Sequence, residues 1–329
     1  MPERVKLIFN TCTDPHFNLA LEEYLLLRRS ENFFMLWRNT KSVIVGMNQN
    51  TAAEINAAFV RENGIAVVRR LTGGGAVFHD EGNINYTFIE NGTAHRNDFA
   101  RFSAPVTNAL QKYGIAAELS GRNDIVANGG KISGAAQCVK NGRVLHHGTL
   151  LYSADLSALA GALNVSALKI ESKGIKSVRS RVLNIASLIE NPAVVTDFMT
   201  SFFNEIKAVT GGEIYDLTPA EVEEVNALAD EKYRTDEWNY APSRPFDLRV
   251  EKRLESGCYD ANLRVENGVI KELRLYGDYF ADGDISLLEN ALKGVKYDYE
   301  SISLAAGEAG VSSLLPGVTP GTFAELLGV

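Results

Sequence analysis

The chain has few cysteines and no long apolar run, and both shortages narrow the class of protein. Its three cysteines, Cys12, Cys138 and Cys258, lie far apart and outside any CxxC pair. Three scattered cysteines favour neither a disulfide framework nor a structural zinc site. We therefore expect a reducing cytoplasmic location. Charged residues interrupt the apolar stretches of the N-terminal region, which therefore predicts neither a signal peptide nor a membrane span.

Positive charge is also scarce. The 33 lysines and arginines are outnumbered by 41 aspartates and glutamates, which gives a formal net charge of −8. Nucleic acids and anionic membranes bind basic surfaces, so we expect neither as a partner. The apolar content of 45% is ordinary for a soluble globular protein, and a length of 329 residues favours two domains.

The patterns that are present predict strands mixed with helices. Asp14 and Pro15 form a helix start ahead of FNLALEEYLLLRR, and NINYTFIE alternates as a half-buried strand does. The pairs Asn128-Gly129 and Asn141-Gly142 are typical of hairpin turns. Because the strands come in hairpins rather than in βαβ units, we expect an α+β fold with a mixed or antiparallel sheet.

The segment YAPSRPF, with two prolines and no clear period, is a candidate linker. We therefore predict one domain over residues 1–244 and a small α+β domain over residues 245–329. The second stretch contains strand-like sequences and a helix around residues 285–292, and its size suits a small domain.

The most informative segment is RRLTGGGAVFHD, in which a strand leads into three glycines and then a second strand. Glycines allow positive φ angles and a close approach of backbone N–H groups to a ligand. Arg69 or Arg70 can place a guanidinium on a phosphate or carboxylate. The alternative interpretation is a glycine-rich hairpin with solvated arginines.

Two familiar nucleotide motifs are excluded. A P-loop requires GxxxxGK[ST], but Gly130-Lys131 is followed by isoleucine. A dinucleotide fingerprint requires a helix after the glycines, whereas a strand follows Gly75 here.

A second segment, GRNDIVANGGKISG, places Lys131 just after a tight turn. A lysine there can set a compact positive charge beside an acyl carbonyl and an α-phosphate. Asn123 and Asp124 carry oxygens that suit Mg²⁺ bound with a nucleotide. A surface hairpin lysine and an Asx turn are the alternative. A third segment, HHGTLLY, has His146 and His147 on opposite sides of a strand, so one is expected to face inward and the other outward. A satisfied core histidine is the alternative for either of them.

Taken together, RR-x-x-GGGAVFHD, GRND, K-x-SG-x-A and HHGTLL resemble the lipoate–protein ligase family in order and approximate spacing. The opening DPHFNLALEE, the LWRN strand and KGIKSVRSRV are also similar to that family. The resemblance runs through residues 5–190. It implies a catalytic domain of the biotin/lipoate ligase type, related to class II aminoacyl-tRNA synthetases, followed by a smaller C-terminal accessory domain.

The resemblance also implies roles for individual residues. Lys131 would be the catalytic residue and would contact the lipoyl carbonyl and the phosphate. ATP and the adenylate would be held by Lys131 with Arg70, Gly75, Ala76, Val77 and Phe78. Lipoate would be bound by Lys131 with Gly74, His79, Gly134, His147, Gly148 and Thr149. Asp124 as a Mg²⁺ ligand is an inference from its carboxylate and does not come from the resemblance.

The implied activity uses ATP and Mg²⁺ to convert lipoate to lipoyl-AMP and then transfers the lipoyl group to a lysine of a carrier domain. The implied carriers are the acyltransferase subunits of 2-oxoacid dehydrogenases and the glycine-cleavage H protein. An apolar acyl pocket discriminates only weakly between chains, so octanoate is expected to be a usable but weaker substrate.

Two other functions stay open at this point. A cysteine-dependent octanoyl or lipoyl transferase of the same fold would need an activated thiolate, and Cys138 is the one candidate near Lys131. A non-catalytic module that binds lipoyl carriers could use the same motifs. A basic stretch could steer an acidic carrier domain, could cover the adenylate, or could be a solvated face, and it comprises Lys169, Lys173, Lys176, Arg179 and Arg181.

Overall fold

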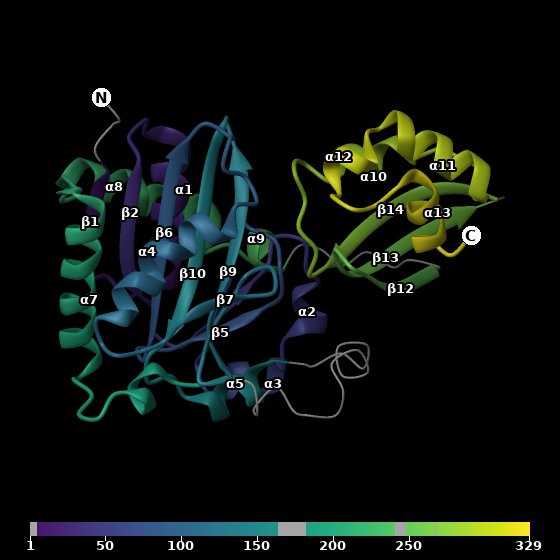
Figure 1. Cartoon of the computed structure of the whole chain (residues 1–329). Coiled ribbons are helices and arrows are strands. Elements are labelled where there is room, and N and C mark those ends of the chain that lie inside the picture. Colours follow the sequence, from purple (N-terminus) through teal and green to yellow (C-terminus); the bar gives the residue numbers. More distant parts are fainter. Residues whose placement is uncertain (1–4, 164–181, 241–247, 267) are drawn as a thin grey trace. The chain divides into compact units, whose positions relative to one another are not determined.

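The computed structural model describes residues 5–163, 182–240, 248–266 and 268–329 (Figure 1). The chain divides into two compact units. Unit 1 consists of Met1–Ile44, Ala52–Arg69 and Val77–Asn239, and unit 2 of Val45–Thr51, Arg70–Ala76 and Tyr240–Val329. The basic stretch from Lys169 to Arg181 lies outside the described residues. Among the residues described, no helix combines the length and apolar character that crossing a membrane requires.

Unit 1 is built on an eight-stranded sheet with the order β11-β1-β2-β6-β10-β9-β8-β7. The β11, β1 and β2 strands run parallel, and the neighbours from β2 onward run antiparallel, which confirms the expected mixed sheet. The strands are β1 (Lys6–Phe9), β2 (Phe33–Arg38), β6 (Asn83–Asn91), β7 (Glu118–Ser120), β8 (Asp124–Ala127), β9 (Gly130–Lys140), β10 (Arg143–Leu151) and β11 (Glu213–Ile214).

Both predicted hairpin turns are confirmed. Asn128 and Gly129 have φ angles of 49° and 75°, and Asn141 and Gly142 have φ angles of 48° and 72°. Two successive positive φ angles match the twist of antiparallel strands, and asparagine followed by glycine tolerates them best. The two hairpins share β9, so β8, β9 and β10 form one continuous meander.

Helices cover both faces of this sheet (Figure 1). The α1 helix begins as predicted, with Asp14 accepting the backbone N–H of His16 at 2.9 Å and Pro15 in the first turn. The opposite face carries the main apolar core of unit 1, in which Phe102 and Phe198 pack against the strands. The main helices are α1 (Pro15–Arg28) on one face and α4 (Phe99–Gln111) and α7 (Val195–Thr210) on the other.

Because both faces are covered, the interpretation of NINYTFIE as a half-buried strand is wrong. The first seven residues of β6 are all buried. The polar residues of the alternation face the α1 side of the sheet, where they are enclosed rather than solvated.

A second sheet in the same part of the chain has the order β4-β3-β5 and carries the glycine segment between two of its strands. Short helices and one π-helical turn complete the unit. The strands are β3 (Ser42–Val45), β4 (Ala66–Arg69) and β5 (Val77–His79), and the remaining helical elements are α2 (Thr51–Glu54), α3 (Ala57–Glu62), α5 (Leu156–Ala162), η2 (Ile185–Leu188), α8 (Pro219–Leu228), η3 (Ala229–Tyr233) and α9 (Asp236–Tyr240).

Unit 2 contains an antiparallel sheet, β12-β13-β14, that packs against a group of helices. Its core includes Tyr259 and Tyr279, whose rings stack with centroids 4.5 Å apart. The elements are β12 (Leu248–Leu254), β13 (Gly257–Glu266), β14 (Val269–Gly277), α10 (Ser286–Ala291), α11 (Tyr299–Glu308), α12 (Val311–Leu314) and α13 (Pro320–Leu326). The predicted domain boundary after residue 244 falls within 241–247, outside the described residues.

Two short segments from the first half of the chain cluster with unit 2. The N–H of Gly277 donates to the carbonyl of Asn48 at 2.7 Å, and the N–H of Gly74 donates to the carbonyl of Tyr279 at 3.4 Å. Nothing in the sequence pattern indicated these pairings, because they join segments more than 200 residues apart.

Candidate active site

The glycine loop between β4 and β5 owes its glycines partly to close backbone packing. Gly74 has a φ of +88°, which side chains with a Cβ rarely adopt. A Cβ on Gly73 would lie 2.5 Å from the carbonyl oxygen of Tyr279, and one on Gly46 would collide with the carbonyl of Gly74. The loop is therefore held by backbone on two sides.

Arg70 shapes this loop from inside. Its Nε donates to the Thr72 hydroxyl at 2.9 Å, and its Nη2 donates to the carbonyls of Gly73 and Gly75 at 2.6 and 2.9 Å. The side chain is only 5% exposed. With two carbonyls turned toward the guanidinium, the N–H groups of Gly75 and Ala76 have no acceptor among the residues that the structure describes. Such paired amides are suited to an anionic oxygen.

Arg69 is committed elsewhere. Its Nε donates to the carbonyl of Trp238 at 3.0 Å, its backbone N–H donates to the Asn239 side chain at 2.9 Å, and the Trp238 indole donates back to the Arg69 carbonyl at 2.9 Å. Of the two arginines, Arg70 is thus the one that belongs to the loop. Just beyond the loop in β5, Val77 is half-buried and pairs with Ile44, while Phe78 is buried.

Lys131 forms an ion pair with Asp124 across the β8–β9 hairpin. The Nζ of Lys131 lies 2.7 Å from Oδ1 of Asp124, and both side chains are about one-third exposed, at 36% and 35%. A Cβ on Gly134 would stand 2.9 Å from this Nζ, so a glycine there leaves room for the lysine. Thr149 closes the group, because its hydroxyl accepts the N–H of Gly134 at 3.3 Å.

A β-bulge brings Lys131 to the same side as Gly134. In a regular strand, residues three apart point to opposite faces. Here Ile125 pairs with Ser133 while Val126 pairs with Lys131, so β9 has one extra residue at Ile132. Bulges of this kind re-aim side chains and are common beside active sites.

From this ion pair a row of residues extends across the sheet on the α1 face. Asn85 of β6 is directly opposite Thr149 on one side and Trp37 of β2 on the other. Residues opposite one another in register share a face, so this row leads from Trp37 to the Lys131–Asp124 pair. Sequence reasoning missed Trp37 and Asn85, and the alternation of NINYTFIE was the signal that could have indicated Asn85.

The row contains buried polar atoms that lack partners. The Asn83 side chain donates to Oδ1 of Asn85 at 2.9 Å, but Oδ1 of Asn83 and Nδ2 of Asn85 have no hydrogen-bond partner among the described residues. Leaving such groups unpaired costs about 1–3 kcal/mol each. Unsatisfied buried groups of this kind are typical of a site that a ligand completes.

His147 also lies on this face, where it bonds a carboxylate of α1. Its Nδ1 is 2.9 and 3.0 Å from the two carboxylate oxygens of Glu22, and both side chains are buried. The Thr87 hydroxyl donates to Glu22 at 2.6 Å and accepts the Trp37 indole N–H at 2.9 Å. This series of hydrogen bonds holds the Trp37 indole in place. Glu22 and Thr87 were not anticipated from the sequence.

His146 lies on the other face, as strand alternation predicts, but it is also buried, so the expectation that one histidine faces outward is wrong. It stacks on Phe102 with centroids 4.9 Å apart, and burial lowers its pKa to about 3. Gly148 lies on this same face, where a Cβ would collide with the Tyr86 ring. On the β5 strand, His79 is buried with Nδ1 3.1 Å from the Asn39 amide nitrogen.

Eight of the predicted residues thus fall into two local groups. The structure brings Lys131, Asp124, Gly134 and Thr149 together within unit 1. Arg70, Gly74, Gly75 and Ala76 form the loop that clusters with unit 2.

The environment of Cys138 does not favour a reactive thiol. Burial raises the pKa of this thiol to about 12, and the nearby carboxylates of Glu22 and Glu23 add to the rise. The thiolate is the nucleophilic form, so this cysteine is largely unreactive at neutral pH.

Comparison with known proteins identifies the family. The family described as "Lipoyl protein ligase A/B catalytic domain" matches residues 14–207, and "Bacterial lipoate protein ligase C-terminus" matches residues 243–327. The chain is 42% identical to lipoate–protein ligase 1 of Staphylococcus aureus, covering 91% of this chain and 92% of that protein. It is 40% identical to lipoate-protein ligase LplJ of Bacillus subtilis, with 95% and 97% covered.

Solved structures give the same picture. LipL1 of P. falciparum in complex with lipoate is 27% identical with a TM-score of 0.74, covering 92% of this chain and 94% of that chain. A bi-partite lipoate protein ligase of Thermoplasma acidophilum, described with its E2 lipoyl domain, is 26% identical with a TM-score of 0.65, covering 75% and 100%. A lipoate-protein ligase A bound with ATP is 26% identical with a TM-score of 0.61, covering 73% and 99%. The chain therefore belongs to the lipoate–protein ligase family.

Proposed function

We propose that this ligase converts lipoate and ATP to lipoyl-AMP and pyrophosphate, and then transfers the lipoyl group to a lysine of a carrier domain. The observation that carries the proposal is the Lys131–Asp124 pair at the end of the buried polar row on the α1 face. A carboxylate is a poor electrophile, and formation of the mixed anhydride with AMP makes its carbonyl reactive. A catalyst of this kind works mainly by positioning and electrostatics.

In the first step the lipoate carboxylate attacks the α-phosphate and pyrophosphate leaves. Lys131 would offset the negative charge that gathers on the phosphate and the carboxylate. The N–H groups of Gly75 and Ala76 would donate to phosphate oxygens, and Arg70 would keep the loop in the shape that presents them. Val77 and Phe78 would continue the nucleotide-binding backbone.

The acyl chain would lie along the α1 face of the sheet. Trp37 and His147 are both fixed there by hydrogen bonds, and Asn85 offers an amide for a polar group of the ligand. Gly74, His79, Gly134 and Thr149 complete the proposed lipoate set, together with Gly148, which would contribute backbone only because its Cα–H side faces the opposite core. Because apolar contacts with an acyl chain separate related chains by only about 1–3 kcal/mol per group, octanoate would be a usable but poorer substrate.

The described residues could supply only part of the coordination of a Mg²⁺ ion. Among the described residues no three His, Cys, Asp or Glu side chains gather to hold a metal ion. Asp124 is a single carboxylate, and one of its oxygens already forms an ion pair with the Lys131 ammonium. Mg²⁺ commonly combines one or two carboxylates with substrate phosphates, so Asp124 would supply at most one ligand to an ion that ATP brings. The ion would neutralise charge on the phosphates.

In the second step the amine of a carrier lysine attacks the anhydride carbonyl and AMP leaves. The carriers we propose are lipoyl domains of 2-oxoacid dehydrogenase acyltransferase subunits and the glycine-cleavage H protein, in the cytoplasm. The relative described with its E2 lipoyl domain supports this class of partner. The raised pKa of Cys138 weighs against a transferase that would use a thiolate.

The experiment is carrier lipoylation measured by intact mass. Purified protein, lipoate and an apo lipoyl domain are incubated with and without ATP. We expect the mass increase of one lipoyl group with ATP and none without it. Acyl transfer from a thioester donor in the absence of ATP would instead establish a transferase, and binding without modification would establish a carrier-binding module.

A further inference from the structure

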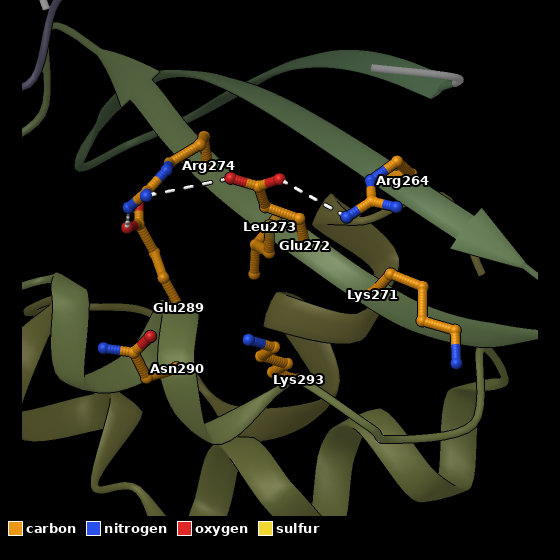
Figure 2. Close-up of a pocket in the computed structure, with 8 residues that line it drawn as sticks. All are labelled: Arg264, Lys271, Glu272, Leu273, Arg274, Glu289, Asn290 and Lys293. Carbon is orange, nitrogen blue, oxygen red and sulfur yellow. Dashed lines mark hydrogen bonds and ion pairs between the residues drawn. The ribbon is translucent and has the colours of Figure 1, made fainter. Parts of the chain in front are cut away.

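The small C-terminal domain is acidic, yet its positive charges are concentrated in one place. Residues 245–329 contain eight lysines and arginines against fourteen aspartates and glutamates, a formal charge of −6. Four of these eight cations line a single cleft of about 180 Å³ beside β14 and α10 (Figure 2). They are Arg264, Lys271, Arg274 and Lys293.

The two carboxylates of the cleft are already satisfied. Glu289 accepts Arg274 Nη1 at 2.7 Å and the backbone N–H of Leu275 at 2.9 Å. Glu272 lies between two guanidinium groups, 3.7 Å from Arg264 and 3.8 Å from Arg274 (Figure 2). Arg274 is therefore held in place from both sides, and no carboxylate of the cleft remains for the lysines.

The side-chain ammonium groups of Lys271 and Lys293 have no ion pair or hydrogen bond with any residue that the structure describes. Figure 2 shows both ammonium groups away from the dashed ion pairs. Four cations against two carboxylates leave the cleft with two positive charges in excess. A fixed cationic surface within an acidic domain is an anion-recognition site by its charge pattern.

The lining favours a protein over a small anion. Phosphate sites commonly use backbone N–H groups, but the Leu275 N–H here is occupied by Glu289. Lys293 and Arg274 are exposed, so a macromolecule can reach them. Leu287 of α10 is 61% exposed and lies three residues before Asn290, which lines the cleft. Residues three apart on a helix are neighbours, so an exposed apolar side chain adjoins Asn290 at the edge of the cleft.

We propose that this cleft docks an acidic segment of the carrier protein during lipoyl transfer, an inference that rests on the proposed function. The chain as a whole carries −8 and repels an acidic partner. Local cations offset this repulsion and raise the rate of productive encounter. The cleft is thus a carrier-docking site separate from the residues that handle lipoate and ATP.

The test reverses the two unpaired lysines in the full-length enzyme. The double variant Lys271→Glu/Lys293→Glu should raise the KM for an apo lipoyl domain by about 10-fold, because like charges now face the partner. The wild-type KM should rise with salt, whereas that of the variant should depend on salt much less. ATP–pyrophosphate exchange with lipoate should stay unchanged, since it needs no carrier.

Two matched variants sharpen the result. Lys271→Arg/Lys293→Arg keeps the charge and should retain the wild-type KM. Lys112→Glu/Lys207→Glu makes the same charge change at two exposed lysines of unit 1 and should have little effect. A carrier KM unchanged by reversal, or raised equally by the unit 1 control, contradicts the docking site. A raised KM for ATP shows instead that the cleft serves a small anion.

Failure of the docking site and failure of the proposed function are distinguishable. If wild-type enzyme lipoylates the carrier and reversal changes nothing, only the docking site is wrong. If wild-type enzyme shows neither exchange nor lipoylation, the proposed function itself is wrong. Circular dichroism verifies that each variant is folded, and the milder Lys271→Gln/Lys293→Gln variant should raise the carrier KM to a smaller extent.

Discussion

The two faces of the eight-stranded sheet differ in what they bury. Toward α4 and α7 the strands present aromatic and aliphatic side chains such as Phe34 and Phe88, which form the main core of unit 1. Toward α1, β6 presents Asn83, Asn85 and Thr87, all buried. Buried polar groups cost stability unless they are bonded, so a fold gains nothing from an unpaired amide. One face therefore maintains the fold, and we propose that the other binds the ligand.

The largest effect should come from the apolar face. Phe102 is 2% exposed and stacks on His146. Phe102→Ala should lower the free energy of unfolding by about 3–5 kcal/mol, through lost burial and a cavity. Urea denaturation measures this change. The lipoate KM of the folded fraction should be near normal, and a changed KM with full stability would reverse the assignment of the two faces.

Lys131 at the end of the polar row should show the opposite behaviour. Lys131→Ala should reduce lipoyl-AMP formation by about 10²–10³-fold with little loss of stability, because it removes a fixed cation from developing charge. Pyrophosphate release in the presence of lipoate measures the rate. Lys140→Ala, on the same strand, is the matched control and should stay near wild type. Normal release by a folded Lys131→Ala protein would remove Lys131 from the mechanism.

Asn85 tests the polar face directly. Asn85→Leu should raise the KM for lipoate by about 10-fold, since a polar contact to the ligand is lost. The same change removes the unpaired amide nitrogen of Asn85 but also the oxygen that accepts the Asn83 side chain, so the two effects offset and the urea midpoint should change little. Both quantities come from one protein preparation. A lower midpoint together with an unchanged KM would mean that Asn85 serves the fold.

His146 makes the apolar face sensitive to acid. Burial lowers its pKa to about 3, below the usual value of about 6.5 for an unfolded chain. Between these values the unfolded chain takes up a proton that the folded chain does not, so stability falls as pH falls through this window. The slope from this one group is about 1.4 kcal/mol per pH unit.

Urea denaturation at several pH values between about 3.5 and 6.5 measures that slope. His146→Leu should reduce the slope of the unfolding free energy with pH by the contribution of about one proton. His95→Gln, at an exposed site, should leave the slope unchanged. An identical pH slope in His146→Leu and wild type would show that His146 is protonated in the folded state.

The smallest effect is expected at Cys138. Cys138→Ala should retain ATP-dependent lipoylation within a few-fold and cost about 1 kcal/mol of stability, because its thiol is unreactive and half-buried. Carrier mass after a timed reaction gives the activity. Complete loss of transfer by a folded Cys138→Ala protein would point to a thiol mechanism.

The hairpins were predictable because Asn128-Gly129 and Asn141-Gly142 carry local backbone preferences that decide the turn. The start of α1 at Asp14 was predictable for the same reason. Burial of Asn85 was not, because alternation looks the same whether the polar side meets water or a helix. The bulge that re-aims Lys131 adds a single residue, and its sequence carries no separate signal.

The association of the glycine loop with Tyr279 could not be predicted from the sequence either, because it joins distant segments through backbone atoms. The role of Arg70 in binding ATP stays a prediction, and its bonds to the Gly73 and Gly75 carbonyls were not foreseen. The family resemblance supplied roles for these residues, and the structure supplied their partners.

The measurement that tests the account most directly is ATP–pyrophosphate exchange with lipoate in the absence of any carrier. Exchange requires reversible formation of lipoyl-AMP and nothing beyond it. We predict exchange that saturates with lipoate, persists in Cys138→Ala and falls by about 10²–10³-fold in Lys131→Ala. No exchange by a folded wild-type protein, together with ATP-independent transfer from an acyl thioester, would contradict the ligase mechanism.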